Sequence, residues 1–176
     1  MEVASELAVY GPRGEKEERD LRELLLLAST VADPWDRTLP LHLTASALVV
    51  DGAGRLLLRW HERQGRWLQV GGHADPGETS ALAVAMREAR EETGLADLEP
   101  LSDRLVHLAV VDVLPGKGEP AHRHGDLRYV LSTSSPGSAV AEDAVADLRW
   151  LSFDEALAEF AGTNLSVLAE RMQELL

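Results

Sequence analysis

The spacing of apolar residues along this chain predicts where its helices and strands lie. Residues 15–31 are expected to form a helix, because their apolar side chains recur at the i, i+3, i+4, i+7 spacing of a buried stripe. The stripe consists of Leu21, Leu24, Leu25 and Ala28. The extended apolar runs at 41–51 and 55–60 flank the turn sequence Asp51-Gly-Ala-Gly and predict a β-hairpin.

The rest of the chain predicts an irregular alternation of strands and helices. Strands are expected at 67–70, 104–114, 127–132 and 148–151, and helices at roughly 79–93, 154–160 and 164–176. His122 and His124 then fall in the loop before the strand at 127–132. Residues 1–14 stay ambiguous, because Gly11-Pro12-Arg13-Gly14 breaks any regular element. This order predicts an α/β (α+β) fold, with a mixed sheet between helices on both faces.

Composition excludes several classes of function. The chain has 176 residues, enough for one domain with a small terminal extension, and its formal net charge is −13. That charge argues against binding to a nucleic-acid polymer, which needs clustered Lys and Arg. The absence of cysteine excludes disulfides, thiolate metal sites and cysteine nucleophiles. No apolar run approaches the ~18 residues of a membrane span, and no signal peptide is recognisable, so we expect a cytoplasmic protein without membrane contact.

The helix at 79–93 has clear signals at both ends and an uneven distribution of charge. Thr79 or Ser80 is a plausible N-cap, and Gly94 suits the left-handed position beyond the C-terminus. A rotation of about 100° per residue gathers an apolar stripe that should face the core, formed by Leu82, Ala85, Met86 and Ala89. The same rotation gathers three carboxylates on a second side: Glu88, Glu91 and Glu92.

These three carboxylates form either a solvated acidic face or a cation site. They lie in the last turns of the helix, where the helix dipole disfavours negative charge, so helix stability alone does not explain them. Three neighbouring anions repel one another unless a positive charge lies among them. Arg87 lies four residues before Glu91 and can hold that carboxylate in one rotamer. A hard divalent cation is therefore the leading hypothesis, and phosphate chemistry follows from it.

The segment around this helix resembles the Nudix box. That motif reads Gly, five residues, Glu, seven residues, Arg-Glu, an apolar residue, any residue, Glu-Glu, any residue, Gly and an apolar residue. Gly72 and Glu78 match its beginning, and the run from Arg87 to Leu95 matches its end. Eight residues separate Glu78 from Arg87 here, one more than usual. We expect the junction between loop and helix to absorb the extra residue.

The resemblance implies a Nudix-type α/β/α sandwich that hydrolyses a nucleoside diphosphate derivative or a related small diphosphate. Water would attack phosphorus with the help of Mg²⁺ or Mn²⁺. The implied metal ligands are Glu88, Glu91, Glu92 and a backbone carbonyl of Gly71 or Gly72. Glu88 or Glu91 would act as general base, and Arg87 joins them as a catalytic residue.

Two alternatives within the family are weighed against a hydrolase. A non-catalytic ligand-sensing module with this fold usually loses box carboxylates or carries a DNA-binding domain, and this chain keeps the carboxylates and leaves little room for such a domain. An isoprenoid diphosphate isomerase usually needs a catalytic cysteine, which is absent. The resemblance also implies a small phosphorylated substrate and allows a homodimer.

Residues outside the helix are candidates for contact with substrate. They are His73, Glu78, Arg123, His124 and Trp67. His122 and His124 also resemble a metal cluster by composition, and Arg128 is a second candidate for phosphate. Trp60 or Trp67 offers a face for a nucleobase or serves the core. Glu142 and Asp143 are possible bases outside the box. We expect residues 1–35 to be an N-terminal extension with a helix, and residues 36–176 to be the Nudix domain.

Overall fold

The computed structural model describes residues 3–116, 118, 120–142 and 146–176. Its helices and strands follow one another as α1 (Val3–Ala8), α2 (Glu15–Thr30), β1 (Leu41–Asp51), β2 (Leu56–His61), β3 (Arg66–Leu68), β4 (Val70–Gly72), α3 (Ala81–Thr93), β5 (Glu99–Pro100), β6 (His107–Val113), β7 (His122–Thr133), the 3-10 helix η1 (Pro136–Ser138), β8 (Leu148–Leu151), α4 (Phe153–Glu159) and α5 (Leu165–Gln173). Within the described ranges, no helix has the length and apolar character needed to cross a membrane.

The strands form one mixed sheet of eight strands around a central parallel pair. The path runs β3-β2-β1-β7-β5, while β4 pairs with β1, β6 with β7 and β8 with β2. β1 and β7 run parallel along their length, from Leu41 opposite Arg123 to Asp51 opposite Thr133. The other pairs are antiparallel, including the predicted hairpin of β1 and β2. The expectation of a mixed sheet is confirmed.

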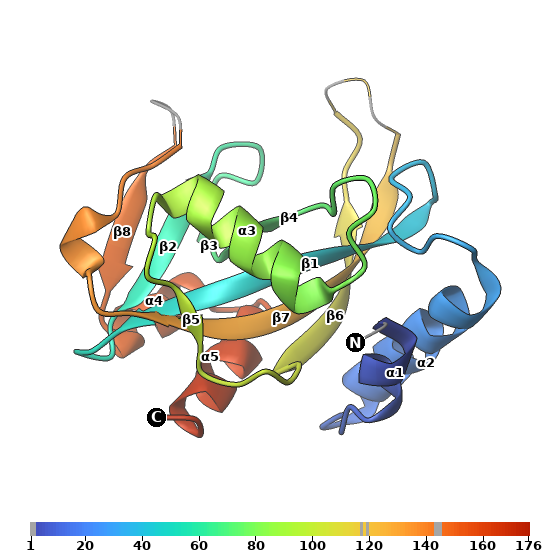
Figure 1. Cartoon of the computed structure of the whole chain (residues 1–176), viewed down its shortest axis with the longest axis horizontal. Helices are drawn as coiled ribbons and strands as arrows, with labels where there is room; N and C mark the ends of the chain where they lie inside the picture. The colour runs from blue at the N-terminus through green and yellow to red at the C-terminus, as the bar shows by residue number, and fades with distance from the viewer. Residues whose placement is uncertain (1–2, 117, 119, 143–145) are drawn as a thin grey trace.

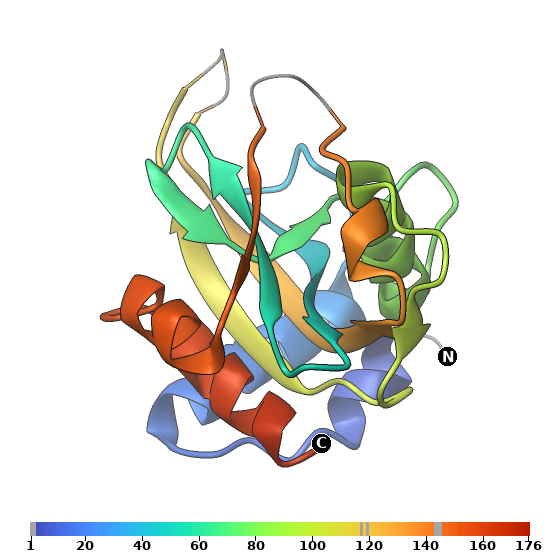
Figure 2. The ribbon, with the colours of Figure 1, turned by 90° about the vertical axis from the view of Figure 1, so that its left-hand side faces the viewer.

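Helices cover both faces of this sheet and create two apolar cores. α3 lies across one face, and α4 and α5 cover the opposite face (Figures 1 and 2). The side chains of β1 alternate between them, since Ala47 and Val49 join the α3 core while Leu48 and Val50 join the α4/α5 core. β1 is therefore buried along its whole length, and its polar side chains, His42, Thr44, Ser46 and Asp51, are buried with the apolar ones.

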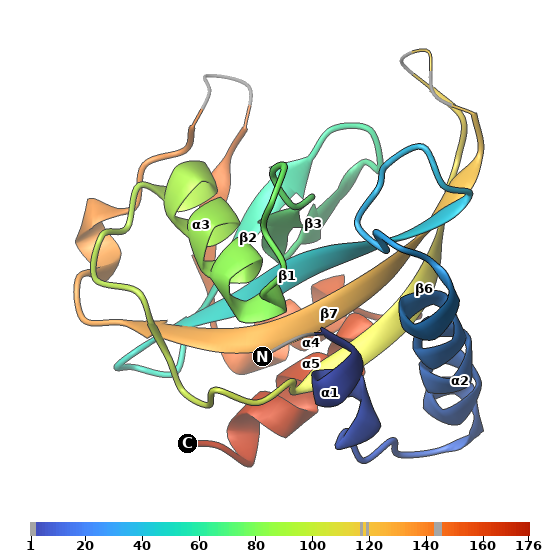
Figure 3. The ribbon, with the colours of Figure 1, turned by 45° about the vertical axis from the view of Figure 1, so that its right-hand side comes forward.

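The N-terminal helices extend the α3 core. α1 and α2 lie together beside β6 (Figure 3). Leu21 and Leu24 are buried as the stripe predicted, and Leu25 and Ala28 pack against the same core. The ambiguous segment 1–14 contributes α1, whose Leu7 is completely buried.

Two features of the sequence reading need correction. β7 begins at His122, so His122 and His124 belong to a strand and not to the predicted loop. The strand extends that far because its first residues pair with both β1 and β6, a long-range interaction that local sequence does not encode.

The buried face of α3 is also rotated from the predicted stripe. Ala85 and Ala89 are buried as expected, whereas Leu82 and Met86 are only partly buried and Val84 takes a core position. Small side chains thus face the sheet, where the backbone approaches closely, and the larger ones lie at the flanks of the helix.

Candidate active site at the carboxylate helix

The ends of α3 are fixed by the caps that the sequence predicted. The hydroxyl oxygen of Ser80 accepts a hydrogen bond from the backbone N–H of Ala83 at 3.4 Å. Gly94 ends the helix with φ of 66°, a left-handed conformation that favours glycine. Residues 78–80 are not helical, so the extra residue after Glu78 is absorbed at the junction as expected.

The glycine pair of β4 touches the carboxylates of α3 directly. The backbone N–H of Gly71 donates to Oε2 of Glu92 at 2.9 Å. A Cβ atom on Gly72 would lie 2.6 Å from the carboxyl carbon of Glu88, and one on Gly71 would lie 2.4 Å from Cβ of Ser46. Gly71, whose φ is 149°, meets Cα and Cβ of Ser46, so glycine is required there. At Gly72 a side chain would have to displace the carboxylate of Glu88, so the peptide backbone lies against the acidic side of the helix.

Arg87 connects the box from one end to the other. Its Nη1 donates to Glu88 at 3.0 Å and to Glu91 at 2.8 Å. Its Nη2 donates to Glu78 and to the carbonyl oxygen of His73, both at 2.8 Å. One guanidinium therefore orients three carboxylates and the loop that follows β4, and it keeps Glu78 near the helix despite the extra residue.

Burial and hydrogen bonding give the carboxylates different pKa values. Desolvation raises the pKa of Glu92 to about 7, although the Gly71 N–H and Arg59 oppose the shift. Burial likewise raises the pKa of Glu88. The hydrogen bonds from Arg87 lower the pKa of Glu78, and the same pairing raises the pKa of Arg87. The charged forms of Glu88 and Glu92 are thus disfavoured, because nearby positive charge does not fully compensate their burial.

The donor set suits a hard divalent cation. Carboxylate oxygens and the nearby glycine backbone are ligands that Mg²⁺ and Mn²⁺ prefer. Glu88 and Glu92 expose only 17% and 13% of their side chains, whereas Glu91 exposes 49%. A cation would supply the charge that the two buried carboxylates lack, so these residues fit such an ion.

Other predicted site residues are engaged elsewhere. Arg123 forms an ion pair with Glu23 of α2 at 2.7 Å. Trp67 is buried in the α4/α5 core, and the guanidinium of Arg149 lies 4.5 Å from the centre of its ring. Glu142, by contrast, is exposed and near enough to Glu92 that its charge helps to raise the pKa of that carboxyl, while Asp143 lies outside the described residues.

A buried polar cluster on the sheet also engages Arg128. Its Nε donates to Asp126 at 2.7 Å, and its Nη1 donates to Asn164 at 2.6 Å. Asp126 in turn accepts a hydrogen bond from the hydroxyl of Ser46 on β1 at 2.9 Å. Arg128 is therefore a structural residue of the sheet, held by Asp126, Asn164 and His107.

His73 and His124 come together with two further histidines at the start of β1 and β7. Within the described ranges, one set of three potential metal ligands has all its ligand atoms within 4.8 Å of one another: His42, His122 and His124. His42 was missed by the sequence reading, because a single His in an apolar strand carries no signal of its own. Arg59, whose Nε lies 3.4 Å from Oε1 of Glu92, was also missed, because a single Arg in a strand carries no signal of its own.

Comparisons with known proteins indicate the family to which this chain is similar. The family model described as NUDIX domain matches residues 40–170. A probable DHNTP pyrophosphohydrolase of Lactococcus lactis is 32% identical over 131 residues, which cover 73% of this chain and 76% of the relative.

Two solved structures share the fold at low identity. A Caenorhabditis elegans Ap4A hydrolase has a TM-score of 0.57 at 18% identity, covering 75% of this chain and 95% of its own. The Escherichia coli dihydroneopterin triphosphate pyrophosphohydrolase has a TM-score of 0.56 at 17% identity, covering 77% and 94%.

Proposed function

This chain belongs to the Nudix family of pyrophosphohydrolases, and we propose that it hydrolyses a small nucleoside-type diphosphate or triphosphate with the help of a divalent metal ion. The observation that carries the proposal is the contact between the glycine turn and the carboxylate helix. Gly71 binds Glu92, Gly72 leaves no room beside Glu88, and Arg87 holds both Glu88 and Glu91.

Each residue has a distinct task in this proposal. Glu88 and Glu92, the more buried carboxylates, hold Mg²⁺ or Mn²⁺ together with a carbonyl oxygen of the glycine turn. When bound, the ion would neutralise charge on the phosphoryl oxygens and lower the pKa of the water that it binds. Glu91 is the more exposed carboxylate, so water reaches it, and it accepts the proton of the attacking water. Arg87 fixes the direction of Glu91 and keeps the glycine loop in place through the carbonyl of His73.

The substrate class is narrowed by one relative. The relative at 32% identity is named as a probable DHNTP pyrophosphohydrolase, so a pteridine triphosphate is the first compound to test. The two proteins of known structure are named for different substrates. The shared fold therefore does not decide the substrate. The family model begins at residue 40, which supports residues 1–35 as an extension to a Nudix domain at 36–176.

A substrate panel tests the proposal. Dihydroneopterin triphosphate, diadenosine tetraphosphate, ADP-ribose and a nucleotide sugar would be incubated with Mg²⁺ in H₂¹⁸O, and the products analysed by mass spectrometry. We expect turnover of at least one compound, with ¹⁸O in a phosphate-containing product, because water attacks phosphorus. Parallel reactions with excess chelator should show no turnover. Turnover that persists unchanged in chelator would contradict the metal-assisted mechanism.

A further inference from the structure

Four histidines from three parts of the chain meet beside the carboxylate site. His42 lies on β1, His122 and His124 begin β7, and His73 follows the glycine turn of β4. The ring centre of His42 lies 5.3 Å from that of His122 and 4.9 Å from that of His124. His42 is 1% exposed, so part of the cluster is inside the protein.

Two backbone carbonyls fix which ring nitrogens face the cluster. Nδ1 of His42 lies 3.0 Å from the carbonyl oxygen of Leu39, and Nδ1 of His122 lies 2.9 Å from that of Pro120. A carbonyl oxygen only accepts, so each Nδ1 must carry the hydrogen. With its hydrogen on Nδ1, the uncharged form of each of these two rings presents an unprotonated Nε2 to the cluster. A carbonyl behind the ring is the usual support of a metal-ligating histidine.

Two pairs of inner nitrogens are spaced nearly as in a coordination sphere, and the ligand atoms of His42, His122 and His124 all lie within 4.8 Å of one another. Nε2 of His42 lies 3.1 Å from Nε2 of His73, and Nε2 of His122 lies 3.1 Å from Nε2 of His124. Two nitrogens bound tetrahedrally at 2.0–2.1 Å from one zinc ion are about 3.3 Å apart. Small ring rotations would bring both pairs onto one ion.

We propose that His42, His122 and His124 bind a borderline transition-metal ion such as Zn²⁺. His73 takes the fourth position, because its Nε2 already approaches that of His42. Imidazole nitrogens favour such ions over Mg²⁺, which prefers oxygen. This site is separate from the carboxylate site in donor chemistry and in residues.

The electrostatic state of the cluster suits metal binding. Burial and the neighbouring His73 and His42 lower the pKa of His124 to about 3, and burial also lowers the pKa of His42. These rings are neutral at pH 7, as ligands must be, so binding a metal ion releases no proton from them. His124 donates from Nε2 to Nε2 of His122, so its hydrogen would move to Nδ1 when Nε2 binds the ion.

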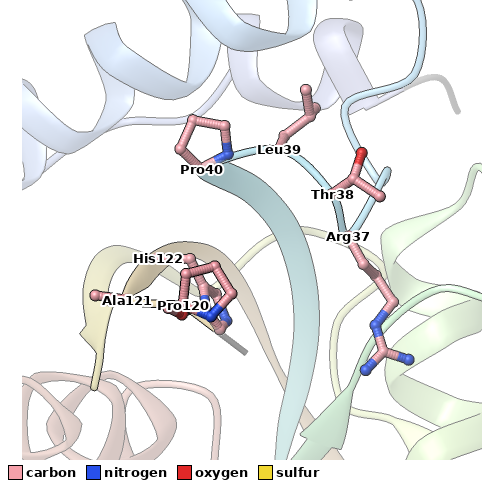
Figure 4. A pocket seen from close by; sticks show the side chains of 7 residues that line it. All are labelled: Arg37, Thr38, Leu39, Pro40, Pro120, Ala121 and His122. Carbon is pink, nitrogen blue, oxygen red and sulfur yellow. The ribbon is translucent and has the colours of Figure 1, made fainter. Parts of the chain in front are cut away.

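A pocket gives an ion access to the cluster. Its volume is about 360 Å³, and it lies between the segment 37–40 before β1 and the segment 120–122 at the start of β7 (Figure 4). His122 belongs to the lining of this pocket. An ion bound there would join β1, β7 and the loop of His73, whose carbonyl accepts from Arg87. The site would therefore brace the loop of the active site.

Zinc binding by matched variants tests this inference. Metal-free protein would be titrated with Zn²⁺ against a chromophoric chelator, with excess Mg²⁺ to occupy the carboxylate site. We expect one tightly bound Zn²⁺ per chain, and affinity reduced at least about 100-fold in the H122Q/H124Q double variant. The H61Q variant, which changes a histidine outside the cluster, and the E88Q/E91Q variant should bind as the wild type does.

Two further readouts do not depend on turnover. Co²⁺ in place of Zn²⁺ should give the intense visible absorption of four-coordinate cobalt in wild type and lose it in H122Q/H124Q. Zn²⁺ at 100 times its Kd should raise the Tm of the wild type by about 5–10 °C and not that of H122Q/H124Q. Absence of uptake by the wild type would overturn the proposal. Uptake that E88Q/E91Q abolishes and H122Q/H124Q leaves intact would overturn it too, while supporting the carboxylate site.

Discussion

The carboxylate site and the histidine cluster are neighbours with opposite chemistry. The first offers oxygen donors and contains its own cation, Arg87, which binds Glu88 and Glu91. The second offers imidazole nitrogens, and its His42 and His122 direct Nδ1 outward to backbone carbonyls. The comparison teaches that donor type alone would direct a hard ion to the first site and a borderline ion to the second. The two sites meet at His73, whose carbonyl binds Arg87 and whose ring binds His42.

Removal of the carboxylate of Glu91 should have the largest effect on turnover at the carboxylate site. Glu91→Gln keeps the size and the helix propensity but cannot accept the proton of water. We expect turnover to fall on the order of 10³-fold with Tm unchanged within a few degrees. Steady-state kinetics and thermal unfolding measure both quantities. Glu170→Gln on α5 is the matched control, and a wild-type rate in Glu91→Gln would make that carboxylate a surface residue.

The close contact at Gly72 gives the next largest effect. A methyl group there would lie 2.6 Å from the carboxyl carbon of Glu88, so Gly72→Ala must push that carboxylate away from its place. We expect turnover to fall about 10²-fold, as small misplacements of catalytic groups do. Gly52→Ala is the control, because no atom lies within 4 Å of its added methyl group. Equal rates for both variants would contradict the role of the glycine turn.

The charge of Glu92 should appear in the pH dependence of stability. Its folded pKa of about 7 is above the ordinary value of 4.5, so the native state holds the proton more tightly than the unfolded state. The free energy of unfolding therefore decreases as pH rises from about 4.5 to 7 and is flat above. Glu92→Gln in chelator should remove roughly 2 kcal/mol of this decrease. Urea unfolding at pH 5 and pH 8 measures it, and parallel curves for the two proteins would contradict it.

Substitution of Arg87, which links the two sites, should have the smallest effect on turnover. Arg87→Lys keeps the charge but loses the planar fork that reaches Glu78, Glu88 and Glu91 together. We expect turnover to fall about 10-fold, and more in Arg87→Gln, which also loses the charge. Steady-state kinetics of both variants make the comparison. If Arg87→Gln equals the wild type, the guanidinium does not position the carboxylates.

The sequence predicts the local geometry of the carboxylate helix well, because the residues concerned lie within one element. The caps, the acidic side and the pairing of Arg87 with Glu91 all follow from spacings of three or four residues. Ser80 and Gly94 take the expected cap positions, and the hairpin of β1 and β2 follows from its turn sequence.

The histidine cluster could not be predicted in this way. His122 and His124 stand out by their spacing, but His42 and His73 lie far from them along the chain and join them because β1 pairs with β7 and with β4. The burial of Glu17 on α2 is a second case, since its partners are Arg171 on α5 and His107 on β6. No local pattern encodes such long-range contacts. The sequence therefore predicts sites built on one element better than sites built between elements.

Binding of Mn²⁺ to the carboxylate site tests the account most directly. Electron paramagnetic resonance would count bound Mn²⁺ in the wild type and in the E88Q/E92Q double variant, each with one equivalent of Zn²⁺ and a non-hydrolysable diphosphate present. The account predicts Mn²⁺ bound to the wild type and affinity lowered at least about 100-fold in the variant. Equal binding by the two proteins, or none by the wild type, would contradict the carboxylate helix as the metal site.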